Sequence, residues 1–230
     1  MKLFNLDSPF MQAMNKIADL MWLNVLTMIC CIPIFTAGAS LTAMHYMALK
    51  IVRDEECYIT RDFFKSFKLN FRQGTVIWLI MLVVFLLLAG DFYIINNSGL
   101  EFNRAMRVIL IVITFLALFA SVFVFPVLAK FDNTVMRTIK NAFFIGILQF
   151  PKTILMMALL VVPIVLLAYF PKITPVVFLY GFSGPAWASA KLYNKFFQKL
   201  EDQYMEANPQ PEEETEEAGE DEKIFSDKLD

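Results

Sequence analysis

The residues with the clearest potential for chemistry in this sequence are basic side chains in a polar segment between two apolar runs. Four of them recur at spacings of four, three and four residues, which places them on one face of a helix. Guanidinium and ammonium groups in such a row attract phosphate and carboxylate oxygens, and each is worth about 1 kcal/mol beside anionic lipid. The segment therefore predicts a site for lipid head groups or an acidic partner surface, formed by Arg53, Arg61, Lys65, Lys68 and Arg72.

Phenylalanines accompany these basic residues on the adjoining face of the same helix. Phe64, Phe67 and Phe71 are spaced three and four residues apart. The segment 60–73 is therefore predicted to be an amphipathic helix that lies flat on the inner membrane surface. Two interpretations follow: the helix anchors its loop to the membrane, as any basic and aromatic interfacial helix does, or it docks a cytoplasmic partner.

A second set of candidates consists of polar residues inside long apolar runs, namely Asn24, His45 and Asp91. Polar groups in the hydrocarbon region are costly, so they mark functional sites or hydrogen bonds between helices. The ordinary interpretation of each is an interhelical hydrogen bond or a place near the interface. The functional alternative is a water-lined cavity reached by all three, as a transporter or channel would need.

The sequence offers no constellation for catalysis or for a bound cofactor. One histidine cannot build a histidine-based metal cluster or a convincing Ser/His/Asp arrangement. The three cysteines, Cys30, Cys31 and Cys57, contain no CxxC pair, and the phosphate-binding patterns GxxxxGK[ST] and GxGxxG are absent. We therefore expect no enzymatic activity, no metal, no cofactor and no nucleic-acid partner.

The elements that must position these residues are predicted from composition. Hydrophobic residues make up 58% of the 230-residue chain, more than the about 45–50% of soluble domains. Several apolar runs approach the roughly 20 residues that a membrane-crossing helix needs. They predict an all-α, polytopic transmembrane helical bundle with interfacial amphipathic helices. Its six predicted spans cover residues 18–37, 38–52, 75–95, 107–129, 153–170 and 173–191.

The predicted span at 38–52 is short, and two alternatives remain open. Either residues 20–52 form a helical hairpin that turns near Gly38, or one span is followed by an interfacial helix and the total is five. Basic residues concentrate between Lys50 and Arg72, which favours six spans with both termini in the cytoplasm. Residues 1–200 would then form the transmembrane domain, and residues 201–230 an acidic, disordered tail.

Short motifs along most of the chain resemble those of the YesL family, small bacterial membrane proteins known chiefly as a domain of unknown function. The resemblance runs from about Leu6 to Phe197 and is carried by Gly38-Ala39-Ser40, Tyr46, Leu49-Lys50, Arg53, Arg61-Asp62-Phe63-Phe64, Phe67-Lys68, Asn70-Phe71 and Gln73, with support from Pro126, Lys140-Asn141-Ala142, Pro151 and Gly181-Phe182-Ser183.

The resemblance implies a multi-pass protein of the bacterial cell membrane, often encoded near sugar ABC transporters and polysaccharide-degrading enzymes. It implies an accessory component of carbohydrate uptake, with transporter subunits and membrane lipids as partners. The EAA-type signature of a permease is not found in the sequence, so the chain is not expected to be the permease itself. The alternative is a self-contained small-solute transporter or channel, acting alone or as an oligomer.

Overall fold

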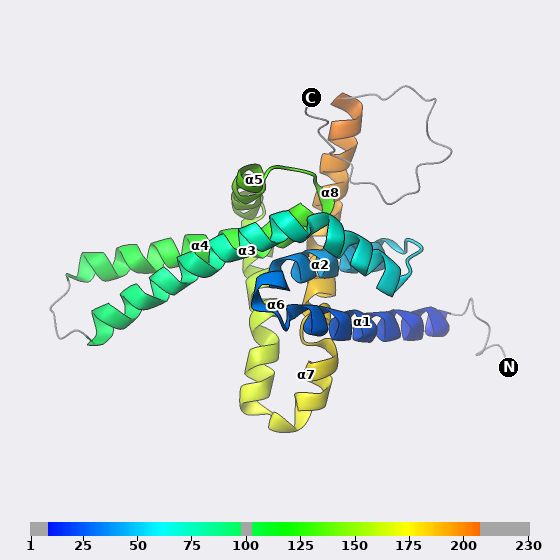
Figure 1. Cartoon of the computed structure of the whole chain (residues 1–230), viewed down its shortest axis with the longest axis horizontal. Coiled ribbons are helices and arrows are strands. Elements are labelled where there is room, and N and C mark those ends of the chain that lie inside the picture. The colour runs from blue at the N-terminus through cyan, green and yellow to red at the C-terminus, as the bar shows by residue number, and fades with distance from the viewer. Residues whose placement is uncertain (1–8, 98–102, 208–230) are drawn as a thin grey trace.

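The computed structural model describes residues 9–97 and 103–207, and every regular element within those ranges is a helix. The all-α prediction is confirmed for this part of the chain. The elements, drawn in Figure 1, are α1 (Pro9–Cys31), the 3-10 turn η1 (Ile34–Thr36), α2 (Ala37–Arg53), α3 (Ile59–Asn97), α4 (Arg104–Lys130), α5 (Val135–Leu148), α6 (Phe150–Tyr169), the 3-10 turn η2 (Pro171–Ile173), α7 (Thr174–Tyr180) and α8 (Ser183–Ala207).

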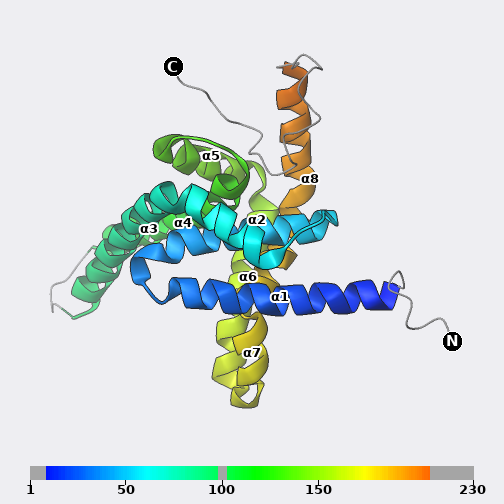
Figure 2. The same cartoon turned by 45° about the vertical axis from the view of Figure 1, so that its right-hand side comes forward.

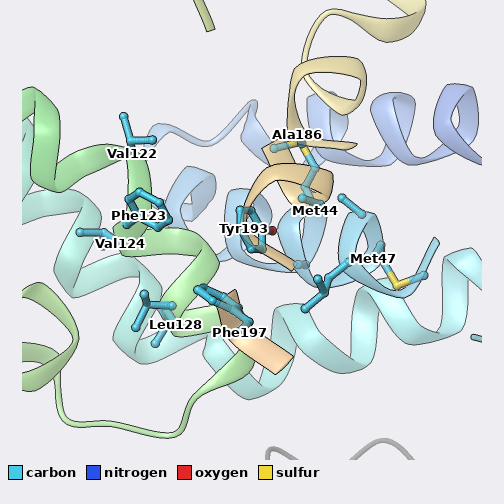
Figure 3. Packing of buried hydrophobic residues seen from close by; sticks show 14 of the residues in the cluster. Met44, Met47, Val122, Phe123, Val124, Leu128, Ala186, Tyr193 and Phe197 are labelled. Carbon is cyan, nitrogen blue, oxygen red and sulfur yellow. The ribbon is translucent and has the colours of Figure 1, made fainter. Parts of the chain in front are cut away.

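The main core forms where α2, the first half of α3, the second half of α4 and α8 meet. Tyr193 and Phe197 lie one turn apart on α8, with ring centroids 4.7 Å apart, and both are fully buried. Figure 3 shows these two rings between Phe123 of α4 and Met47 of α2. Because large buried aromatics contribute most to core packing, α8 is held by the same core as the N-terminal helices.

Helices α2 and α3 approach most closely where two glycines face each other. A Cβ added to Gly38 would lie 2.1 Å from the carbonyl oxygen of Gly74, and one added to Gly74 would lie 2.9 Å from the backbone nitrogen of Ala39. Only glycine fits at both positions, because any side chain there would force the two backbones apart.

Two apolar hairpins project from the core in different directions. Helices α3 and α4 form the first, with its own small apolar cluster around Leu88, Ile95 and Leu110. Helices α6 and α7 form the second, and Figures 1 and 2 agree that it crosses the direction of the first. Within the described residues, α3, α4 and α6 are the helices long and apolar enough to cross a membrane, which is three rather than the six predicted.

The predicted spans at 18–37 and 38–52 differ from the observed helices. Helix α1 ends at Cys31, ahead of Pro33, and η1 separates it from α2, because proline cannot donate the backbone hydrogen bond that would continue the helix. Helix α2 has 17 residues, and most of its side chains are buried against protein rather than turned outward.

The predicted span at 173–191 is likewise not one helix. The short helix α7 ends at Tyr180, and α8 begins at Ser183 after a two-residue turn. The hydrophobic run that suggested a span therefore belongs to a broken helix, and α8 turns polar soon after the break.

Two further predictions change at the ends of these helices. Residues 60–73 and the predicted span 75–95 are one continuous helix, α3, so the basic segment is not a separate interfacial helix. Helix α8 extends to Ala207, so residues 201–207 are helical rather than part of a disordered tail. Residues 208–230 lie outside the described residues.

Candidate functional site

The first half of α3 has two opposite faces. Its buried positions recur every three or four residues and pack against the core: Ile59, Phe63, Ser66, Asn70, Gly74 and Ile77. Four basic residues lie two positions after Ile59, Phe63, Ser66 and Asn70, respectively. Two positions correspond to a rotation of about 200° around a helix, so the basic side chains lie on the face opposite the core. All four, Arg61, Lys65, Lys68 and Arg72, are exposed; together they are called the basic stripe. The predicted shared face is therefore confirmed.

A ladder of aromatic rings runs along the edge of the basic stripe. Phe67 stacks on Phe63 with ring centroids 6.3 Å apart, and Phe71 lies 5.6 Å from Phe67. Phe63 is fully buried, whereas Phe64 and Phe71 are each 38% exposed. The ladder thus fixes the outer rings to the core while it leaves apolar surface beside the charges, a combination that suits a lipid surface or an acidic protein partner.

Arg53 does not belong to the basic stripe. Its guanidinium donates to both carboxylate oxygens of Glu201, at 2.8 and 3.0 Å, and its Nε donates to Oδ1 of Asn194 at 2.8 Å. The Arg53 and Glu201 side chains are only 10% and 8% exposed. Nζ of Lys130 lies 3.7 Å from the same Glu201 carboxylate. Arg53 therefore ties the ends of α2, α4 and α8 together and is not available to a partner, contrary to the prediction.

A second buried ion pair closes the loop between α2 and α3. Nζ of Lys50 lies 3.4 Å from Oδ2 of Asp62, with both side chains less than a tenth exposed. The same oxygen accepts a hydrogen bond from the backbone N–H of Tyr58 at 3.2 Å. Cys57 lies in this loop, and burial, followed by the nearby Asp19 carboxylate, raises the pKa of its thiol. The thiol is thus held protonated, which is unfavourable for a nucleophile.

Asn24 joins α1 to the break between α7 and α8. Its Oδ1 accepts from the backbone N–H groups of Phe182 and Ser183, at 2.8 and 2.9 Å, and its Nδ2 donates to the carbonyl oxygen of Phe178 at 2.8 Å. These backbone groups have no helical partner at the break, and an unpaired buried group is costly. The amide of Asn24 is therefore used to stabilise the broken helix.

His45 and Asp91, the other two intramembrane candidates, lie apart. His45 is buried on α2 and lines a cavity of about 650 Å³ together with Trp78, Phe178 and Phe182. Asn24 borders the same region through its bonds to the last two. Asp91 is exposed in the α3–α4 hairpin and does not line this cavity. The structure thus places His45 on the cavity wall and joins Asn24 to two residues of that wall, whereas Asp91 lies elsewhere.

Sequence reasoning missed Glu201, Asn194 and Trp78. Glu201 was assigned to the acidic tail, although a signal for its burial exists in the sequence. The buried positions of α8 recur at helical spacing, and Glu201 continues their series: Ala186, Ala190, Tyr193 and Phe197. No comparable signal identifies Trp78, because its place on the cavity depends on how α3 crosses α2.

The described residues hold no group of three or more His, Cys, Asp or Glu side chains that could bind a metal. Comparison with known proteins adds one finding. Residues 20–92 match the family model described as "Protein of unknown function, DUF624". That stretch contains the Gly38–Gly74 crossing, the Lys50–Asp62 pair and the basic stripe. No curated protein and no solved structure matches the chain.

Proposed function

We propose that this chain is a multi-pass protein of the bacterial cell membrane that acts as a non-enzymatic accessory component of a membrane assembly. The observation that carries this proposal is the basic stripe. Its four side chains are exposed on the face of α3 opposite the core. The ion pairs of Arg53 and Lys50 lie inside the protein, away from this face. Exposed charge on a rigidly packed helix suits docking.

The membrane arrangement that we propose places the basic stripe on the cytoplasmic side. Helix α3 has 39 residues and is about 58 Å long, roughly twice the about 30 Å of the hydrocarbon core. Its apolar second half and α4 would cross the bilayer, and its basic first half would extend beyond it. The ion-pair cluster of Arg53, Lys130 and Glu201 supports this arrangement, since it puts the basic ends of α2 and α4 on one side.

The partner that we propose is a sugar ABC transporter, with the chain as an accessory component of carbohydrate uptake. This narrower proposal rests on the resemblance to the YesL family and on no contact within the chain. The alternative, a self-contained small-solute transporter or channel, would need a polar path through the protein. The cavity beside His45 is lined mainly by apolar side chains, and Asp91 does not reach it, so the geometry favours the accessory role.

The test is co-purification of the tagged protein in a mild detergent from cells grown on a complex polysaccharide, quantified by mass spectrometry. We expect enrichment of transporter subunits with the wild-type chain. Substitution of the whole basic stripe (Arg61→Gln, Lys65→Gln, Lys68→Gln and Arg72→Gln) should abolish that enrichment without changing thermal stability, because these side chains lie outside the core.

A matched control removes four exposed positive charges elsewhere: Lys140→Gln, Lys191→Gln, Lys195→Gln and Lys199→Gln. This variant should retain the partner. Equal loss in both variants would mean that net charge, not the basic stripe, drives association. Retention of the partner after neutralisation of the basic stripe would refute the docking role, and enrichment of a different membrane complex would refute the carbohydrate assignment alone.

A further inference from the structure

Beyond the end of α8 at Ala207, and outside the described residues, the sequence of the chain is strongly acidic. Eight of the eleven residues from 212 to 222 are Asp or Glu, and none is Lys or Arg; this segment is called the acidic run. It holds eight of the 22 acidic residues of the chain, whereas all 20 Lys and Arg lie elsewhere. The rest of the chain is therefore net positive, and the opposite charge for the acidic run is present in the same molecule.

The basic stripe matches the acidic run in charge and in length. From Arg61 to Arg72 it extends over about 17 Å of helix, and its four charges lie on the exposed face of α3. Eleven residues of extended chain reach about 36–40 Å. The acidic run can therefore lie along the whole basic stripe and place a carboxylate beside each basic side chain.

The residues that follow the acidic run add an apolar match. Ile224 and Phe225 come directly after Lys223. Beside the basic stripe, Phe64 and Phe71 are each 38% exposed. A row of carboxylates followed by an apolar pair is complementary to a row of cations with exposed rings at its edge. Residues 212–225 thus carry both features that the first half of α3 presents.

A second row of exposed basic residues on α8 is a poorer match. It contains Lys191, Lys195 and Lys199, one charge fewer than the basic stripe. Among the described side chains of α8, no exposed one is aromatic, so this row offers no exposed ring to an apolar pair. Asp202 and Glu206 are exposed on the same helix beyond Lys199, and they repel further carboxylates.

The acidic run is long enough to reach the basic stripe. Glu201, within the last two turns of α8, is bonded to Arg53, the last residue of α2. Helix α3 begins a short loop after Arg53, so the end of α8 lies on the side of the core from which α3 starts. The 18 residues from 208 to 225 extend up to about 60 Å, about the full length of α3. In the membrane arrangement proposed above, both lie on the cytoplasmic side.

We propose that residues 212–225 bind the basic stripe of their own chain and compete there with the docking partner. The competition rests on the proposed docking function, whereas the intramolecular contact does not. A segment tethered this closely acts at an effective concentration in the mM range, so even a weak contact occupies the basic stripe for much of the time. A partner binds only when it displaces the acidic run.

The contact is tested by the distance between two spin labels in a cysteine-free background (Cys30→Ala, Cys31→Ala and Cys57→Ala). One label is placed at Leu69→Cys, 61% exposed beside the basic stripe, and the other at Thr215→Cys within the acidic run. Neither label removes a charge. We expect a short-distance population in detergent at about 0.01 M salt. It should fall by at least about half at about 1 M salt, where the Debye length is about 3 Å instead of 30 Å.

Two charge variants locate the contact. Neutralisation of the basic stripe (Arg61→Gln, Lys65→Gln, Lys68→Gln and Arg72→Gln) should abolish the short-distance population. The control, Lys140→Gln, Lys191→Gln, Lys195→Gln and Lys199→Gln, should retain it. Absence of short distances in the wild-type chain, or their persistence without the basic stripe, would overturn the proposal. Loss in the control alone would place the acidic run on α8 and would equally overturn it.

The competition is tested with the acidic run neutralised in the full chain: Glu212→Gln, Glu213→Gln, Glu214→Gln, Glu216→Gln, Glu217→Gln, Glu220→Gln, Asp221→Asn and Glu222→Gln. A synthetic peptide of residues 212–225 is the probe. It should bind this variant about threefold more tightly than the wild-type chain, because no tethered segment competes with it. Equal binding to both chains would overturn the proposal.

Co-purification separates failure of this inference from failure of the docking function. Neutralisation of the acidic run should raise recovery of the partner. If neutralisation of the basic stripe releases the partner but leaves the spin-label distances unchanged, the intramolecular contact alone is refuted. If it abolishes the short distances but retains the partner, the docking function is refuted, and with it the competition, whereas the contact itself stands.

Discussion

Arg53 near the end of α2 and Glu201 on α8 form a bidentate ion pair, although 148 positions separate them in the chain. The pair is almost completely buried, and Asn194 and Lys130 add further contacts to its two ends. Buried ion pairs need such additional partners, because the desolvation of two charges offsets much of their attraction. The N-terminal helices and α8 are thus joined by one polar cluster at the edge of the apolar core.

Removal of one partner from this pair should be strongly destabilising. Arg53→Ala leaves the Glu201 carboxylate buried, and we expect a loss of about 3–5 kcal/mol in the free energy of unfolding. Lys16→Ala is the control, because the Lys16–Asp54 pair is 37% and 69% exposed and such pairs contribute about 0–1 kcal/mol. The free energies of unfolding of the two variants are measured by chemical denaturation in detergent. Similar losses of stability in Arg53→Ala and Lys16→Ala would contradict a structural role for the buried pair.

The Gly38–Gly74 crossing should tolerate no side chain. Gly38→Ala places a methyl group against the Gly74 carbonyl, and overpacking of this kind typically costs about 1–3 kcal/mol. Gly90→Ala is the matched control, since nothing lies within 4 Å of an added Cβ there and alanine is the better helix former by about 1 kcal/mol. We expect opposite signs in thermal unfolding; destabilisation by both changes would argue against close contact at the crossing.

Asn24 should be required for the ordered break between α7 and α8. Asn24→Leu removes one donor and one acceptor and leaves three backbone groups unpaired, so we expect a loss of at least about 2 kcal/mol. Hydrogen exchange at the Phe182 and Ser183 amides should accelerate. Thr27→Val serves as the control, because the buried Thr27 hydroxyl bonds only to the Leu23 carbonyl of its own helix and its loss should cost about 1 kcal/mol or less. Unchanged exchange in Asn24→Leu would exclude this capping role.

Local features of the fold were predictable from the sequence. The apolar runs predicted at 107–129 and 153–170 correspond closely to α4 and α6, because hydropathy depends on neighbours in the chain. The basic stripe was also predictable, since residues four, three and four positions apart share a helix face whatever the rest of the chain does.

Features that depend on distant partners were not predictable in this way. Arg53 has the same residue type as Arg61 and Arg72, and only Glu201 of α8 separates its role from theirs. Asn24 was a candidate for an intramembrane functional residue, but its amide bonds to backbone groups at the break between α7 and α8, more than 150 residues later in the chain. Six spans were predicted, whereas three helices of the described residues are long and apolar enough to cross a membrane. Hydropathy does not separate the two cases, because a hydrophobic run can equally be buried against protein, as in α2.

The most direct test of the account is the position of the two ends of α3 relative to the membrane. A cysteine-free background (Cys30→Ala, Cys31→Ala and Cys57→Ala) is combined with either Lys68→Cys or Asn97→Cys, both at exposed positions. Intact cells are then treated with a membrane-impermeant maleimide. The account predicts labelling at position 97 in intact cells and at position 68 only after the membrane is opened. Labelling of both positions from the outside, or of neither until the membrane is opened, would contradict a membrane-crossing α3 that presents the basic stripe to the cytoplasm.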